Sequence, residues 1–72
     1  MKAKGAIYNR IKAVLAEKGL ANLWLAESLG KNKATVSKWC TNETQPSIDT
    51  LFQIAETLNV DVRELLVSNK VK

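Results

Sequence analysis

The sequence contains no histidine and only one cysteine, Cys40. Without histidine, the chain has no side chain whose unperturbed pKa lies near neutrality, and a single thiol cannot form an internal disulfide. A zinc site built from cysteine and histidine is therefore not expected, and we predict neither a metal nor a cofactor. The sequence also lacks a paired-carboxylate motif and a glycine-rich phosphate loop. These absences weigh against an enzyme, although they leave carboxylate or lysine chemistry open.

Long apolar runs are also missing. No stretch approaches the roughly 20 apolar residues that cross a bilayer, and the start MKAKGAIYNR has no apolar segment of the kind found in signal peptides. We therefore expect a protein of the cytosol. With 72 residues the chain is one domain at most, residues 1–72, with both extremities, 1–4 and 69–72, expected to be flexible.

Acidic residues are scarce in the first part of the chain. Residues 1–42 contain eight Lys or Arg but only two Asp or Glu, whereas residues 43–72 contain three and five. A basic half beside an acidic half is typical of a domain that presents one face to a polyanion, although many small domains are basic without binding one.

Apolar residues recur at helical rather than strand spacing, so we predict an all-α fold of five short helices. Four of the apolar stripes are Ile7, Ile11, Val14 and Leu15; Leu25, Ala26 and Leu29; Val36, Trp39 and Cys40; and Ile48, Leu51, Ile54, Ala55 and Leu58. A fifth helix is predicted to begin at Asp61, with Glu64 completing a capping box, and to continue through Leu65 and Leu66. We expect Gly19 to end the first helix and Ser47 to cap the fourth.

The second and third helices, at about 22–29 and about 33–40, are separated by only Gly30, Lys31 and Asn32. Two short helices with a short connector that contains glycine form a helix-turn-helix unit. On a helical wheel, Ala34, Ser37 and Lys38 lie opposite the apolar stripe of helix 33–40, and Lys33 and Thr35 lie beside them. With Asn32 as the N-terminal cap, this small, cationic face suits the major groove of double-stranded DNA. The plain alternative is that its lysines are solvated and bind nothing.

From Leu20 to Leu66 the sequence resembles the lambda-repressor-like helix-turn-helix family, also called the XRE type. The shared pattern consists of a Leu-Ala pair, Leu-Gly, Thr-Val-Ser-Lys, a Pro-Ser turn and a Leu-xx-Ile-Ala-xx-Leu-x-Val helix, found here at 25–26, 29–30, 35–38, 46–47 and 51–60. The resemblance implies a compact five-helix domain that binds DNA, most often as a homodimer that regulates transcription. It would act on the nucleoid when bound.

The resemblance also implies roles for single residues. By matching positions, bases are read by Lys33, Ala34, Ser37 and Lys38, and phosphates are contacted by Asn22, Asn32, Thr35 and Asn42. Relatives often pair an arginine in the first helix with a glutamate at the end of the third. Leu15 and Cys40 stand at those places here, and an apolar exchange of this kind often leaves stability unchanged or improved. Cys40 is therefore predicted to be a core thiol.

Some residues are not explained by the fold. Trp24 lies opposite the apolar stripe of helix 22–29, where it either packs on a neighbouring segment or contacts a partner. Phe52, Val67 and Val71 form a candidate dimer patch, and Lys2 and Lys4 a candidate basic arm.

We thus predict a sequence-specific double-stranded DNA-binding regulator, with repression as the favoured mode. The alternative is a protein-interaction module of the same fold, of the antitoxin or anti-repressor type, that would use Trp24 and the C-terminal apolar residues.

Overall fold

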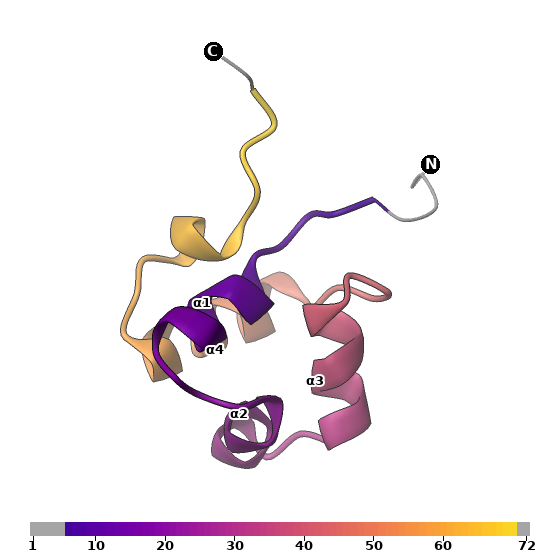
Figure 1. Ribbon diagram of the computed structural model, residues 1–72, viewed down its shortest axis with the longest axis vertical. Coiled ribbons are helices and arrows are strands. Elements are labelled where there is room, and N and C mark those ends of the chain that lie inside the picture. The colour runs from indigo at the N-terminus through magenta and orange to yellow at the C-terminus, as the bar shows by residue number, and fades with distance from the viewer. Residues whose placement is uncertain (1–5, 71–72) are drawn as a thin grey trace.

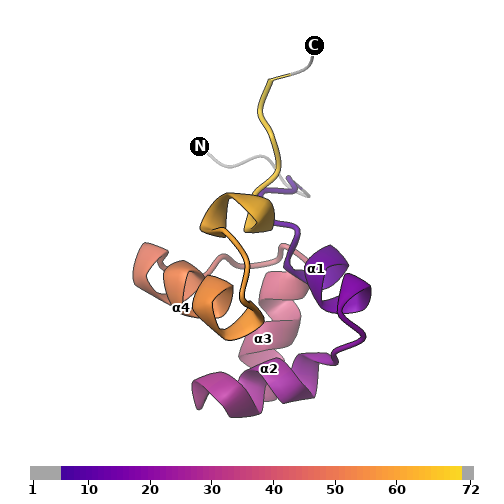
Figure 2. The same cartoon turned by 90° about the vertical axis from the view of Figure 1, so that its left-hand side faces the viewer.

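The computed structural model describes residues 6–70, which contain four α-helices and one short 3-10 helix. The helices are α1 (Ile11–Glu17), α2 (Asn22–Leu29), α3 (Lys33–Cys40), α4 (Ile48–Leu58) and η1 (Val62–Leu65). Helix α3 lies at one edge of the helical body, with α2 across one end of it, and the two ends of the described chain project from the same side (Figure 1). Seen from the other direction, α1 and α4 flank α3, which lies behind them (Figure 2). The predicted all-α fold is confirmed.

The connector between α2 and α3 is built from local backbone chemistry. Gly30 takes a φ of 67°, a left-handed conformation that glycine adopts without steric cost, and this lets the Lys31 N–H donate to the Ala26 carbonyl at 2.9 Å. Two residues later, the Asn32 side chain accepts a hydrogen bond from the Ala34 N–H at 2.7 Å, which confirms Asn32 as the cap of α3. These two interactions fix where α2 ends and where α3 begins.

Helix α4 is bounded by polar side chains and a left-handed residue. Ser47 accepts a hydrogen bond from the Thr50 N–H at 3.2 Å, which confirms it as the N-terminal cap. Asn59, at a φ of 58°, ends the helix. The prediction that Ile48 belongs to the buried stripe was wrong, because its side chain is 69% exposed. Ile48 is the first residue of α4, where it lies outside the seam that the later turns bury.

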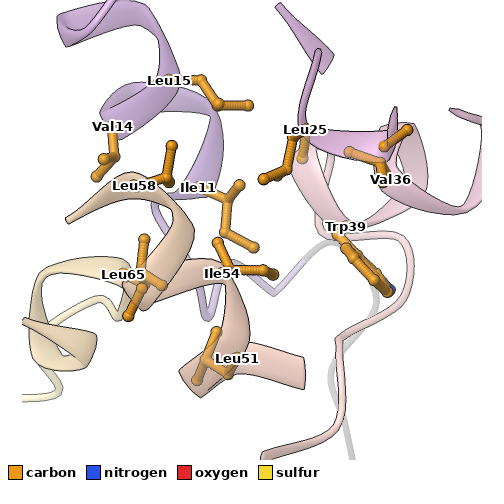
Figure 3. Packing of buried hydrophobic residues seen from close by; sticks show 13 residues of the cluster. Ile11, Val14, Leu15, Leu25, Val36, Trp39, Leu51, Ile54, Leu58 and Leu65 are labelled. Carbon is orange, nitrogen blue, oxygen red and sulfur yellow. The ribbon is translucent and has the colours of Figure 1, made fainter. Parts of the chain in front are cut away.

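The core is a single cluster drawn from all five helices (Figure 3). Its buried members are Ile11, Val14, Leu15, Leu25, Ala26, Val36, Trp39, Cys40, Leu51, Ile54, Ala55, Leu58 and Leu65. Burial of one Leu, Ile or Val side chain stabilises a fold by about 1.5–3 kcal/mol, so this cluster supplies the main force that holds the short helices together. Leu15 and Cys40 are both members, which confirms that the positions of the missing ion pair are filled by apolar packing.

The structure corrects the sequence prediction at both ends of the described chain. Helix α1 begins at Ile11, not Ile7, and Ile7 is 65% exposed. The fifth helix is only the four-residue η1 turn, because Leu66 takes an extended conformation with φ −115° and ψ 147°. The two errors share one cause. The segments on either side pair with each other as a short antiparallel bridge between Asn9 and Leu66, in which the Arg10 N–H donates to the Leu65 carbonyl at 2.8 Å.

One buried amide secures this arrangement. Asn9 is 4% exposed, and its Nδ2 donates to the Trp39 carbonyl at 2.9 Å and to Gln45 Oε1 at 2.7 Å. Its Oδ1 accepts from the Ile11 N–H at 3.0 Å, so the same side chain also satisfies a free N–H at the start of α1. Asn9 therefore joins the start of α1, the end of α3 and the loop that leads to α4.

Candidate nucleic-acid interface

Helix α3 presents two chemically different faces. Val36, Trp39 and Cys40 are buried in the core, and Val36 is wholly inaccessible. On the opposite side, the side chains of Lys33, Ala34 and Lys38 are exposed, and Ser37 and Thr35 are half-buried at the edges. Since residues three and four apart are neighbours on a helix, Ala34, Ser37 and Lys38 form one continuous outward surface, with Lys33 one turn from Ser37. We refer to Lys33, Ala34, Ser37 and Lys38 as the α3 outer face.

The N-terminal end of α3 is polar and carries partial positive charge. Asn32 uses its Oδ1 as the cap, and its Nδ2 makes no hydrogen bond within residues 6–70. The first N–H groups of any helix lack partners inside the helix and attract an anion, an effect that the aligned peptide dipoles strengthen. Asn32 thus lies beside the α3 outer face with a free amide donor, and Thr35 lies one turn further along.

The N-terminal end of α2 is left uncapped. Ala21 has no side chain that could accept a hydrogen bond from the first turn, and the N–H groups of Asn22, Leu23 and Trp24 have no acceptor among residues 6–70. The Asn22 Oδ1 accepts a hydrogen bond from the Cys40 thiol at 3.4 Å. Its Nδ2 has no partner among residues 6–70, and since no buried polar side-chain atom in that range is unsatisfied, this Nδ2 is open to solvent. The N-terminal end of α2 therefore offers one side-chain hydrogen-bond donor, Asn22 Nδ2, and several backbone N–H donors.

Comparison with known proteins agrees with this geometry. The family model described as helix-turn-helix matches residues 11–65, which is most of the chain. The chain belongs to the helix-turn-helix family. The predicted resemblance to its XRE type is thereby confirmed.

Two crystal structures resemble this helix-turn-helix protein. A candidate DNA-binding protein from Bacteroides fragilis is 58% identical with a TM-score of 0.81, and the match covers 82% of this chain and 95% of that one. A transcriptional regulator from Listeria innocua is 25% identical with a TM-score of 0.72, over 93% of this chain and 66% of that one. The search of curated proteins gives no match to this chain.

Asn42, predicted from the resemblance to contact phosphate, has a structural task in this helix-turn-helix protein. Its Oδ1 accepts hydrogen bonds from the N–H groups of Tyr8 at 2.8 Å and Asn9 at 3.0 Å, and from Gln45 Nε2 at 3.0 Å. Its Nδ2 donates to the Asn9 carbonyl at 3.1 Å. The amide therefore holds residues 8–9 against the loop after α3. The phosphate role stays a prediction, and it competes with these hydrogen bonds.

Sequence reasoning missed the network of Asn9, Asn42 and Gln45. These residues are more than 30 positions apart along the chain, except for Asn42 and Gln45, so no local spacing indicates the contact. The one signal in the sequence was the residue type of Asn42, just after the third helix, because asparagine adopts a left-handed backbone more readily than most residues. The structure gives Asn42 such a conformation, with a φ of 62°.

Several apolar side chains remain on the surface. Trp24 is 37% exposed on the outer side of α2, next to Leu23, and Trp39, the other tryptophan, is buried as expected. Of the predicted dimer patch, Phe52 and Val67 are both exposed. Val71, Lys2 and Lys4 lie outside the described residues.

Other kinds of site find no support in residues 6–70. No group of three or more Cys, Asp or Glu side chains in this part of the chain is arranged to hold a metal ion. None of its helices combines the length and the apolar character needed to cross a bilayer. Burial raises the pKa of the Cys40 thiol above its ordinary value, which the positive charge of Lys12 opposes more weakly. The thiol is therefore neutral at pH 7, and a neutral thiol can donate a hydrogen bond.

Replacement of Asn42 by alanine should destabilise the fold, because it removes the acceptor for two backbone N–H groups. Asn59 is a matched control, since it also has a positive φ but makes no side-chain hydrogen bond within residues 6–70. We expect Asn42→Ala to lower the free energy of unfolding by about 1–3 kcal/mol more than Asn59→Ala does, measured by urea denaturation. Equal losses for the two variants would show that the amide network contributes nothing and that only backbone strain matters.

Proposed function

We propose that this protein is a sequence-specific regulator of transcription that binds double-stranded DNA in the cytoplasm and represses the genes beside its site. The observation that carries the proposal is the α3 outer face, a short surface of small and cationic side chains on a helix whose other side is locked into the core. An α-helix fits the major groove of B-DNA, where each base pair presents its own pattern of donors and acceptors. Similarity to a candidate DNA-binding protein and to a transcriptional regulator supports the same function.

In the proposed complex, the α3 outer face reads base edges. Lys33 and Lys38 donate to acceptors such as guanine O6 and N7, Ala34 contacts a thymine methyl group, and Ser37 donates to or accepts from either kind of base. The absence of any large side chain at Ala34 and Ser37 allows the helix backbone to approach the groove floor. The buried anchors Val36 and Trp39 support this approach, because they keep α3 from rotating about its own axis.

Phosphate contacts fix the register of α3 in the groove. Asn22 and Asn32 stand at the N-terminal ends of α2 and α3, each with an unpaired Nδ2 donor in the described chain. The partial positive charge of both helix ends adds to the attraction for a phosphate. Thr35 supplies a hydroxyl on the flank of α3. Asn42 would contribute only if its amide left the network that it forms with Asn9.

Two copies of the chain are proposed to bind as a homodimer on a two-fold symmetric site. Each α3 would then enter the major groove in one half-site, with the half-sites about one helical turn, roughly 34 Å, apart. One domain of this size contacts only a few base pairs, so a second copy doubles the sequence that is read.

A second candidate function, binding to another protein, is favoured by one observation. Ile48 and Phe52 are 69% and 55% exposed and lie one turn apart on α4, so they form an apolar surface. Trp24 adds a separate apolar group on α2. An antitoxin or anti-repressor of this fold would use such surfaces in place of the α3 outer face.

Nuclear magnetic resonance of the ¹⁵N-labelled protein with a mixed-sequence duplex discriminates between the two functions. For a DNA-binding regulator, we expect the largest amide shift changes in the first turns of α2 and α3 and along the α3 outer face. Amides of α4, which lie away from this surface, serve as the internal control. If the duplex leaves the signals of α3 unchanged, or shifts those of α4 instead, the proposed function is wrong.

Single substitutions separate base reading from phosphate contact. On a duplex enriched by the protein, Lys38→Ala should lower discrimination against altered base pairs by about 1–3 kcal/mol, because a side chain that contacts a base edge is lost. Asn22→Ala should weaken binding to all duplexes by a similar factor, since a phosphate carries no sequence information. Affinities measured by fluorescence anisotropy on matched and mismatched duplexes test this division. It would be refuted by a Lys38→Ala variant that loses affinity equally for every sequence.

A further inference from the structure

A side-chain hydrogen bond from Cys40 connects the two helices of the helix-turn-helix unit. It is the last residue of α3, is 6% exposed, and its Sγ donates to Oδ1 of Asn22, the first residue of α2, at 3.4 Å. This is the one side-chain hydrogen bond between α2 and α3 among residues 6–70. Both helices also contribute apolar side chains to the buried core, Leu25 and Ala26 from α2 and Val36 and Trp39 from α3.

We infer that Cys40 is a positioning residue for the phosphate contact of Asn22, a role that rests on the proposed function. An asparagine amide has two ends, and its two orientations exchange the donor and the acceptor. In the structure Cys40 Sγ is the donor and Asn22 Oδ1 the acceptor, which places Oδ1 inward and Nδ2 toward solvent. The thiol favours this orientation because its sulfur is only a weak acceptor for an inward-pointing Nδ2. That orientation presents a donor to a phosphate, whereas the reverse one would present an acceptor, which a phosphate oxygen repels.

The properties of a thiol suit this task at a core position. A thiol is a weak donor and a small apolar group, so it can be a member of the buried core cluster without the desolvation cost of a stronger polar group. Burial keeps its proton in place at neutral pH, as the raised pKa indicates. An ordinary apolar residue would fill the same space but leave both orientations of the Asn22 amide open.

Three variants at this position separate the donor from the packing. Cys40→Val fills the space and removes the donor, Cys40→Ala removes both, and Cys40→Ser retains a donor. If Cys40 acts only through packing, the changes in Asn22 side-chain order and in DNA affinity should follow how much packing each variant loses. The positioning role predicts that Ser behaves like Cys, and that Val and Ala behave alike, once only the folded protein is compared.

The first readout is made without DNA. We expect the ¹⁵N heteronuclear NOE of the Asn22 side-chain amide to fall in Cys40→Val and Cys40→Ala and to stay near the wild-type value in Cys40→Ser. The side-chain amide of Asn69, which is exposed and makes no hydrogen bond within residues 6–70, is the control and should be the same in all four proteins. An unchanged Asn22 signal in Cys40→Val would overturn the proposal.

The second readout is a double-mutant cycle on DNA at about 0.15 M salt, with the folded fraction fixed by thermal melting of each variant. In the wild-type background, Cys40→Val should weaken DNA binding by about three- to tenfold, which is a fraction of what one charge-assisted hydrogen bond contributes. In the Asn22→Ala background, the same substitution should weaken binding by less than about twofold. Equal weakening in both backgrounds would overturn the proposal.

The same cycle distinguishes failure of this inference from failure of the proposed function. If the wild-type protein does not bind DNA, the proposed function fails and the inference fails with it. If the wild-type protein binds and Asn22→Ala weakens binding, but Cys40→Val does not, the positioning role alone is wrong. If Asn22→Ala has no effect on binding, Asn22 is not the phosphate contact and the inference again fails while the function stands.

Discussion

The structure depends on a buried hydrogen-bond network centred on Asn9. An amide that is 4% exposed can be tolerated only if its donors and acceptor are paired, and Asn9 pairs them with three separate parts of the chain. Asn42 and Gln45 complete the network from the loop that follows α3. Hydrophobic packing draws the helices together but is non-directional. The hydrogen bonds of this network fix how the start of α1 lies against the end of α3.

The orientation of α3 is therefore fixed at both ends and along one side. Asn32 caps its start, the carbonyl of Trp39 near its end accepts from Asn9, and Val36 is buried between them. Because these contacts hold α3 from its other side, the α3 outer face does not have to stabilise the fold. Its side chains Lys33, Ala34, Ser37 and Lys38 are therefore available to a ligand. The division of α3 into a structural side and a free side is the physical basis for the function that we propose.

Features with a local cause could be predicted from the sequence. Two of these features are the caps Asn32 and Ser47. Two more are the left-handed glycines after α1 and α2, Gly19 at a φ of 69° just after the C-cap Lys18 and Gly30 at 67°. Like the apolar stripes, they depend only on residues within a few positions along the chain. The errors arose where distant segments decide the conformation. Ile7 fits the helical spacing of the first stripe, but the residues that follow it bond to the end of η1 and the segment after it: the Arg10 N–H donates to the Leu65 carbonyl, and the Tyr8 carbonyl accepts from the Val67 N–H. The same pairing reduces the fifth helix to the η1 turn.

Prediction of the candidate site from the sequence was limited in the same way. The α3 outer face follows from a helical wheel, because the direction of each side chain on a helix depends only on its position. The task of Asn42 and the link between Cys40 and Asn22 require three-dimensional contacts across 33 and 18 positions, which no spacing rule supplies. The resemblance to the family did not help there, because Leu15 and Cys40 stand where relatives often have an ion pair.

The central claim is that two copies of α3 read a DNA sequence. Selection of bound duplexes from a random pool at about 0.15 M salt, where non-specific attraction to phosphates is partly screened, tests it most directly. The account predicts an enriched palindrome whose half-sites are centred about one helical turn apart. Binding that enriches no sequence and disappears as the salt concentration rises would contradict it.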